Sequence, residues 1–357
     1  MYPYAEGLWA ARNQWYVAGW SNEVTRVPME RWLLNEPVVF YRKESGQIVA
    51  LHGRCPHRQY PLVKGNVVGD KLECSYHGFT FDAGGACTRI PTQSVIPASC
   101  KIASYPVVER WNWFWIWMGD PALADESLIP DHDMLKLTAP GWHAVAAATH
   151  LLKARHQLMH ENLCDLSHLT FLHPGIIGVE DVAATEFEVQ GEGMWFRDER
   201  AMYNQSPTGF FADILDYHKP IDRLMSMEFF LPCLHLAAEV FLAHGKQEGE
   251  EGRELGSYRV HHAVTPATPY ETHYFIAYSR NFGIEDSRIT EVINSAFAAV
   301  LQQDVDAVEA LETMLQKSGD RQFKDFLAKG DVTSVKVRRS MEALIRSEQI
   351  PVANVMA

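Results

Sequence analysis

The sequence of 357 residues lacks several features that would indicate its partners. No Lys- or Arg-rich run occurs and the formal net charge is −13, which argues against a nucleic acid or an anionic membrane as a partner. No apolar run is long enough to span a bilayer, and the N-terminus lacks the basic and apolar regions of a signal peptide. We therefore expect a cytoplasmic protein with no membrane partner.

Two further absences concern cysteines and nucleotide cofactors. Four of the six cysteines are scattered without the regular spacing of a disulfide framework, and we expect them to be reduced thiols: Cys87, Cys100, Cys164 and Cys233. The chain has no Gly-x-Gly-x-x-Gly fingerprint and no flavin motif. The sequence therefore gives no indication that this chain itself binds a nicotinamide or flavin cofactor.

The pattern of apolar residues divides the chain into two predicted domains. Residues 1–122 consist of short β-type runs separated by Gly, Pro and charged residues, which predicts a small antiparallel β domain. The aromatic run 111–118 is typical of a core strand, and the stretch 120–133, rich in Pro and acidic residues, is predicted to be a linker.

The second predicted domain, residues 123–357, mixes the two element types. Helices are predicted over 149–172, 286–317 and 332–347, and the stretch 245–254 is predicted to be a loop or hairpin tip. Strand-like runs lie between the helices, at 194–196, 236–242 and 273–278. The order of elements predicts an α+β fold with an antiparallel sheet flanked by helices.

The strongest chemical motif is a Cys-x-His…Cys-x-x-His array formed by Cys55, His57, Cys74 and His77, with 16 residues between its halves. Two thiolates on one iron and two imidazoles on the other are the ligands of a Rieske [2Fe–2S] centre. Two cysteines and two histidines can also bind zinc, but zinc fingers usually pair Cys with Cys and His with His along the chain. Here each half supplies one of each, which favours the Rieske centre.

A second metal site is predicted in the apolar stretch that follows. Asn162, Asp165 and His168 recur every three residues among leucines, so they lie on one side of a helix as short, ligand-type groups. His168 and His173 can face one metal only if the helix loosens or ends between them, and Pro174 is placed to end it. Two histidines and a carboxylate form the facial triad of non-heme Fe(II) sites.

The helix predicted over 286–317 supplies the candidate carboxylate. Asp304 falls within its apolar stripe, where an ionised side chain is costly unless it is paired or bound to a metal, whereas Asp306 falls on the polar face. A rival pair, His156 and His160, has a spacing that suits a metal but no third ligand nearby. We interpret these two histidines as helix-packing or outer-sphere groups.

Together these residues resemble the Rieske non-heme iron oxygenases, in particular the monooxygenase group that contains vanillate O-demethylase, dicamba O-demethylase and toluenesulfonate methyl-monooxygenase. The resemblance covers nearly the whole chain. It rests on the two metal motifs and on the stretches 12–18, 106–110, 115–121, 265–266, 273–275 and 280–283.

The resemblance implies the cofactors and the assembly. Cys55, His57, Cys74 and His77 would hold the cluster, and His168, His173 and Asp304 would hold a mononuclear Fe(II). Asp165 would link His168 to His77 of a neighbouring copy in a head-to-tail homotrimer, with Asn162 as a second catalytic candidate on the same helix side. His262 lies where relatives can place a group that binds a substrate carboxylate.

The predicted function is that of the terminal oxygenase component of an NAD(P)H-driven monooxygenase. A separate reductase, of flavin or ferredoxin type, would supply electrons, and O2 would be used to hydroxylate or O-demethylate a small aromatic substrate. Two alternatives stay open. One is the same machinery acting as a dioxygenase or an N-demethylase, and the other is a Rieske electron-transfer protein without oxygenase activity.

Overall fold

The computed structural model describes residues 2–5, 7–245, 252–319 and 325–349, and the chain forms two units, each with its own core. The small unit consists of Arg12–Ile129 together with Thr265–Pro269. The large unit is built on Pro130–Val264 and the segments before Arg12 and after Pro269. The predicted domain ranges 1–122 and 123–357 stay predictions beside this division.

Three antiparallel sheets make up the small unit. The first contains β1 (Trp15–Trp20), β11 (Trp113–Trp117) and β10 (Val107–Arg110), in this order. The second contains β2 (Met29–Leu33), β3 (Glu36–Arg42), β4 (Ile48–His52) and β9 (Ser104–Tyr105). The third contains β5 (Asn66–Val68), β6 (Lys71–Glu73), β7 (Thr80–Phe81) and β8 (Cys87–Arg89).

The aromatic run predicted as a core strand is β11, and every one of its residues is buried. It pairs with the buried strand β1, where the rings of Trp15 and Trp117 pack edge to face with centroids 5.6 Å apart. Burial of both faces explains why the run is apolar at every position instead of alternating. The predicted linker 120–133 contains two short 3-10 helices, Pro121–Leu123 and Glu126–Leu128.

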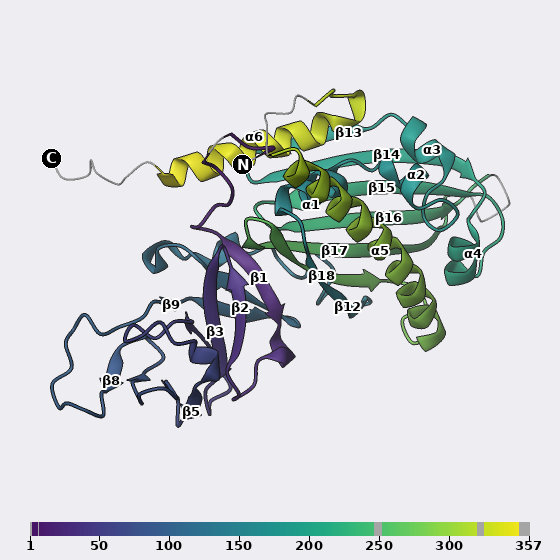
Figure 1. Cartoon of the computed structure of the whole chain (residues 1–357). Coiled ribbons are helices and arrows are strands. Elements are labelled where there is room, and N and C mark those ends of the chain that lie inside the picture. The colour runs from purple at the N-terminus through teal and green to yellow at the C-terminus, as the bar shows by residue number, and fades with distance from the viewer. Residues whose placement is uncertain (1, 6, 246–251, 320–324, 350–357) are drawn as a thin grey trace. The chain divides into compact units, whose positions relative to one another are not determined.

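A seven-stranded sheet forms the large unit (Figure 1). Strands β13 to β18 follow one another across the sheet in chain order, and β12 pairs with β18 at the far edge. Their bounds are β12 (His143–Leu152), β13 (Glu188–Glu192), β14 (Trp195–Gln205), β15 (Ile221–Phe230), β16 (Leu234–Ala243), β17 (Glu254–Thr268) and β18 (Glu271–Arg280).

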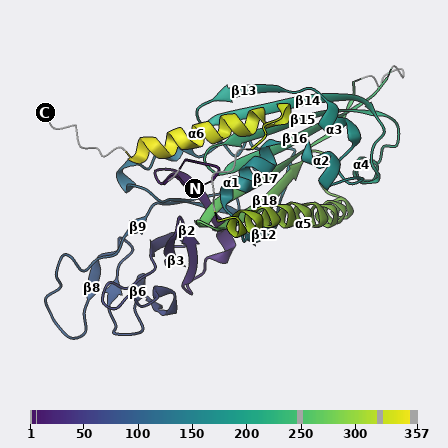
Figure 2. The ribbon, with the colours of Figure 1, turned by 45° about the horizontal axis from the view of Figure 1, so that its top comes forward.

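The described residues of the large unit also form six α-helices: α1 (His156–Cys164), α2 (His168–Leu172), α3 (Glu180–Ala184), α4 (Gly209–Leu215), α5 (Ser287–Lys317) and α6 (Val332–Gln349). In Figures 1 and 2, α5 lies across one face of the seven-stranded sheet. The Asp286 side chain caps α5 by accepting from the Arg288 amide, and its buried stripe of Ile293, Phe297 and Leu301 joins the main core. Helix α6 contacts β13 and β14.

The predicted α+β fold class is confirmed, and so are the two C-terminal helices. The helix predicted over 149–172 is wrong at its start, because residues up to Leu152 belong to β12, where Thr149 lies opposite Phe275 of β18. A short apolar run does not distinguish a buried strand from a helix, and the partner strand decides.

Residues 246–251 of the predicted hairpin tip lie outside the described residues. None of the helices in the described ranges is both long and apolar enough to cross a membrane.

Candidate metal centres

Two loops of the small unit carry the Cys and His motif, and they share one hydrogen-bond pattern. The Cys55 amide donates to the Tyr60 carbonyl, and the Gln59 amide donates to the Cys55 carbonyl. In the second loop the Cys74 amide donates to the Phe79 carbonyl, and the Gly78 amide donates to the Cys74 carbonyl. Two equivalent turns therefore present the four side chains.

The second turn depends on Gly78. Its φ of +70° lies in the left-handed region, and a Cβ at this position would lie 2.8 Å from the Pro91 ring. Any larger residue would strain the loop that carries Cys74 and His77.

The four side chains separate into buried sulfurs and exposed rings. Cys55 and Cys74 are each 1% exposed, whereas His57 and His77 are exposed, with ring centroids 4.5 Å apart. Burial raises the pKa of the Cys55 thiol to about 11, so the thiolate needs a cation beside it. These residues fit a two-iron cluster, in which Cys55 and Cys74 would hold one iron and His57 and His77 the other.

The second predicted site comes together in the large unit. His168, His173 and Asp304 place one ligand atom each within 4.8 Å of one another. His173 Nε2 lies 3.1 Å from Asp304 Oδ1, and His168 Nε2 lies 3.5 Å from the same oxygen. The helical stretch breaks between α1 and α2 and ends again at Leu172, so both imidazoles can turn toward α5.

Hydrogen bonds at Nδ1 set the tautomer of both histidines. His168 Nδ1 lies 2.5 Å from the Asp165 main-chain oxygen, and His173 Nδ1 lies 2.8 Å from Gln303 Oε1. Both partners are acceptors, so both Nδ1 atoms carry a hydrogen. Each Nε2 faces Asp304: it donates to the carboxylate when the ring is protonated, and it is the nitrogen left to bind a metal when the ring is neutral. This is the arrangement that a metal-binding histidine needs.

The electrostatics of the site fit a cation. Burial opposes ionisation of Asp304, but hydrogen bonds from His168 and His173 hold the pKa of its carboxyl well below the usual range. Burial lowers the pKa of His173, and the contacts with Asp304 outweigh this and raise it. In contrast, Asp306 lies exposed beside Gln302, as its position on the polar face predicts.

The two catalytic candidates on the same stretch lie close to this group. Asn162 Nδ2 donates to Asp304 Oδ1 at 3.3 Å, and Asn162 Oδ1 is buried without a partner in the described part of the chain. The Asp165 carboxylate accepts from the Ser167 amide at 2.9 Å. Within one chain, Asp165 therefore contacts His168 through its carbonyl and not through its carboxylate.

The rival histidine pair lies elsewhere. His156 Nε2 contacts the Trp9 carbonyl at 2.6 Å, and His160 Nδ1 contacts His235 Nε2 at 2.8 Å. Both residues are buried, and neither belongs to the three-residue metal group. This agrees with the interpretation of His156 and His160 as packing histidines.

A cavity lies beside the metal group. Its polar wall includes His168, Asp304 and His262, and Glu239, which pairs with Arg223 at 2.8 Å. The rest of the wall is mostly apolar and includes Leu163, Leu166, Leu169, Ile177, Met225, Met227, Tyr258, Val260, Phe297, Val300 and Leu301. An apolar cavity with a few convergent polar groups suits a small aromatic molecule.

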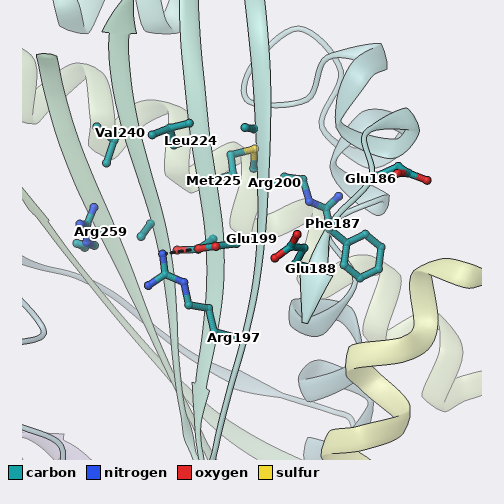
Figure 3. A pocket seen from close by; sticks show the side chains of 13 residues that line it. Glu186, Phe187, Glu188, Arg197, Glu199, Arg200, Leu224, Met225, Val240 and Arg259 are labelled. Atoms are coloured by element: carbon teal, nitrogen blue, oxygen red, sulfur yellow. Dashed lines mark ion pairs between the residues drawn. The ribbon is translucent and has the colours of Figure 1, made fainter. Parts of the chain in front are cut away.

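A wider groove of about 590 Å³ is lined by side chains of β13 to β17 and of the segment before β13 (Figure 3). There Arg197 and Glu199 form an ion pair of 2.9 Å, and Leu224 and Val240 contribute apolar surface. None of the three side chains of the metal group lines this groove. The smaller cavity is therefore the candidate substrate site.

Two residues near the metal group and the cavity do not follow from the sequence pattern. Gln303, on the polar side of α5, orients His173. In the sequence, its position next to Asp304 is the single sign of this role. Tyr274 contacts His262 from the neighbouring strand β18. Tyr274 lies inside a strand-like run, which predicts that it is buried but does not predict a contact with His262.

Two protein families match the two parts of the chain that carry these sites. Residues 14–106 match the Rieske [2Fe-2S] domain family, and residues 152–347 match the vanillate O-demethylase oxygenase C-terminal domain family. The first match decides between an iron–sulfur cluster and zinc, and confirms the Rieske prediction. The second match covers the three side chains of the metal group.

Relatives match over almost the whole chain. The iron–sulfur subunit of the toluene-4-sulfonate monooxygenase system of Comamonas testosteroni is 35% identical, over 87% of this chain and 90% of its own length. The oxygenase component of dicamba O-demethylase of Stenotrophomonas maltophilia is 33% identical, over 94% and 98%. A crystal structure of dicamba monooxygenase bound to 3,6-dichlorosalicylic acid superposes with a TM-score of 0.87 at 31% identity, over 95% of this chain and 98% of the other. The predicted recognition is confirmed: the chain belongs to the family of Rieske-type oxygenase components related to vanillate O-demethylase.

Proposed function

We propose that this oxygenase component inserts one oxygen atom of O2 into a C–H bond of a small aromatic substrate, by hydroxylation or by O-demethylation. The observation that carries the proposal is the group of His168, His173 and Asp304 beside an apolar cavity. The names of the relatives support this class of substrate, since they act on toluene-4-sulfonate, dicamba and vanillate.

The two sites have different functions in this proposal. When bound, the cluster held by Cys55, His57, Cys74 and His77 would store single electrons, and the mononuclear iron would supply the oxygen chemistry. His57 and His77 are exposed, which suits exchange of electrons with a separate reductase. The cavity wall excludes water and holds the aromatic ring beside the metal group.

Asp165 supports a proposal about assembly. Its carboxylate is half-buried and bonded only to the Ser167 amide in the described residues, so one oxygen is left for another partner. We assign that partner to His77 of a neighbouring copy in a head-to-tail homotrimer, a heterologous ring that brings the cluster of one copy to the iron of the next.

Two alternatives differ from this proposal. Dioxygenation or N-demethylation would use the same residues, and labelled O2 separates dioxygenation because two atoms are retained in the product and not one. A Rieske electron-transfer protein would need no second iron, and the buried metal group of the large unit argues against it.

Iron analysis tests the proposal directly. We expect about three irons per chain in the purified holoenzyme, two in the cluster and one in the mononuclear site. Oxygen uptake with a generic reductase and a panel of aromatic acids and aryl ethers then identifies the substrate. A preparation with an intact Rieske spectrum and about two irons per chain would remove the oxygenase proposal.

A further inference from the structure

Two cysteines that hold no metal lie opposite each other in the small unit. Ala86 and Lys101 form an antiparallel bridge, and next to it the Cys87 amide donates to the Cys100 carbonyl at 3.2 Å. Opposite residues of an antiparallel pair have Cα atoms about 4.5–5.5 Å apart and side chains on the same side, a separation that a disulfide can bridge. Both cysteines are free thiols in this structure.

The side chains of this pair are in contact. Burial and a hydrogen bond with the Cys87 thiol raise the pKa of the Cys100 thiol to about 11. Cys87 Sγ also lies 3.4 Å from the Arg89 carbonyl, but a thiol is a weak donor and this contact holds it only weakly. The two sulfur atoms can therefore bond to each other without a large movement of the backbone.

Exposure distinguishes this pair from two other cysteines of the chain. Cys87 and Cys100 are both half-buried, whereas Cys164 and Cys233, in the large unit, are each 1% exposed. The reactivity of a cysteine depends on its exposure, since a reagent in solution must reach the sulfur. We therefore expect an oxidant to react with the pair and not with the two fully buried thiols.

The segment between the two cysteines, residues 88–99, covers one of the cluster loops. Pro91 of this segment packs against Gly78, where a Cβ would lie 2.8 Å from the proline ring. Gly78 belongs to the turn that carries Cys74 and His77, and both cysteines of the pair pack against the core that includes Cys74. A bond between the pair would close the segment into a ring beside this cluster loop.

We propose that Cys87 and Cys100 form a reversible oxidation site whose oxidant is a peroxide. One thiol attacks hydrogen peroxide and becomes a sulfenic acid as water leaves, and the second thiol then displaces another water from that sulfur. Two thiols and one peroxide thus give one disulfide and two waters, and the two electrons of the thiols reduce the peroxide. A thiol reductant restores both cysteines by exchange.

The disulfide would hold residues 88–99 against the cluster loop. Closing a loop of this length removes open conformations and favours the ordered one. The oxidised chain should therefore retain its cluster longer than the reduced chain does. Hydrogen peroxide is the product of two-electron reduction of O2, so an oxygenase that reduces O2 without inserting it into a substrate releases the oxidant itself. The site would then protect the cluster under those conditions.

Peptide mapping of the holoenzyme tests the oxidation site. The protein is treated with a small excess of hydrogen peroxide, its visible Rieske spectrum is recorded, and free thiols are then blocked with iodoacetamide in denaturant before digestion. We expect one linked peptide that joins Cys87 to Cys100 and that separates again after treatment with dithiothreitol. Cys164 and Cys233 are the internal controls and should be fully alkylated in the same sample.

Substitutions test the effect on the cluster. After peroxide has been removed, the wild-type protein should lose its Rieske absorbance in moderate urea about three- to tenfold more slowly than the untreated protein. Cys100→Ser cannot form the bond and should show no such slowing, and Cys87→Ser should give the same result through the other partner. The matched control is Cys233→Ala, which should respond to peroxide as the wild type does.

Three results would overturn the proposal. The first is absence of the linked peptide in a sample that keeps its Rieske spectrum, and the second is oxidation of Cys164 and Cys233 as fast as that of the pair. The third is an equal rate of cluster loss before and after oxidation of the wild type. None of these measurements uses substrate turnover or the mononuclear iron, so their outcome is independent of the proposed function.

Discussion

The two metal centres of this chain are built in opposite ways. The cluster loops lie close together in the sequence and repeat one hydrogen-bond pattern, and they expose His57 and His77. The mononuclear site joins α2 to α5, and His173 and Asp304 are separated by 131 positions and buried. An electron carrier needs contact with solvent and partners, whereas oxygen chemistry needs a dry, shaped cavity.

The largest effect that this comparison predicts comes from the buried site. Asp304→Ala removes the carboxylate that contacts both histidines, so the variant should lose the mononuclear iron and all detectable turnover. The visible Rieske spectrum should be unchanged, because the cluster ligands come from the other unit. Asp306→Ala, two residues away on the exposed face of α5, is the matched control. Iron analysis and visible spectra of both variants test this prediction. Loss of the mononuclear iron in Asp306→Ala but not in Asp304→Ala would contradict the assignment of Asp304 as a ligand.

The next effect concerns the link between the two centres. Asp165→Asn keeps the size of the side chain and an oxygen for the Ser167 amide, but it removes the negative charge that would bind His77 of a neighbouring copy. Both metals should stay bound while turnover falls by roughly a hundredfold or more, since a charge-assisted hydrogen bond in a buried contact is lost. Single-turnover oxidation of the reduced cluster measures the transfer. A rate equal to that of Asp306→Asn would exclude the link.

The difference between the two sites also explains which residues could be predicted from the sequence. The cluster ligands were predictable because both halves of the site are short motifs with fixed spacing. Asp304 was predictable because a carboxylate within an apolar helical stripe is costly without a partner. Gln303 and Tyr274 were not, since their roles depend on which atoms lie beside His173 and His262 after distant elements have packed. The start of the helix predicted over 149–172 failed for the same reason, because β18 supplies the partner of Thr149.

Ion pairs in the two units sharpen the comparison further. In the large unit, Arg155 precedes α1 and its guanidinium contacts Glu312 of α5 at 2.7 and 2.9 Å, with both side chains at most 1% exposed. In the small unit, Arg42 and Glu109 form a pair of 2.8 Å with side chains 22% and 33% exposed. The buried pair joins the start of α1 to α5. Helix α1 comes just before the two histidine ligands in the sequence, and α5 carries Asp304.

The same substitution in both pairs should therefore have unequal effects. Glu312→Gln removes the carboxylate charge from the buried pair with Arg155 and should lower the free energy of unfolding of the large unit by about 3–5 kcal/mol. Glu109→Gln should lower that of the small unit by about 1 kcal/mol or less. Urea denaturation followed by a separate signal for each unit measures both, and equal losses would refute the distinction.

The pH dependence of this effect follows from the pKa of Glu312. Burial raises this pKa, but the hydrogen bonds from Arg155 and Gln316 outweigh burial and hold it below the usual value. A carboxylate with a lowered folded-state pKa stabilises the protein at neutral pH, and this contribution is lost as the pH falls through that pKa. The difference between wild type and Glu312→Gln should therefore shrink in acid.

The smallest of the four effects tests a residue that orients a ligand without binding the metal. Gln303→Leu removes the acceptor of the His173 Nδ1 hydrogen, so the ring can rotate and expose the wrong nitrogen to Asp304. Loss of such an outer contact typically lowers metal affinity by about 10- to 100-fold. Competition with a chelator measures the affinity, and Gln302→Leu is the matched control, because Gln302 is exposed and contacts Asp306. If both variants held iron equally well, the tautomer of His173 would have to be set by the metal itself, and the mononuclear site would then depend on no contact beyond its three ligands.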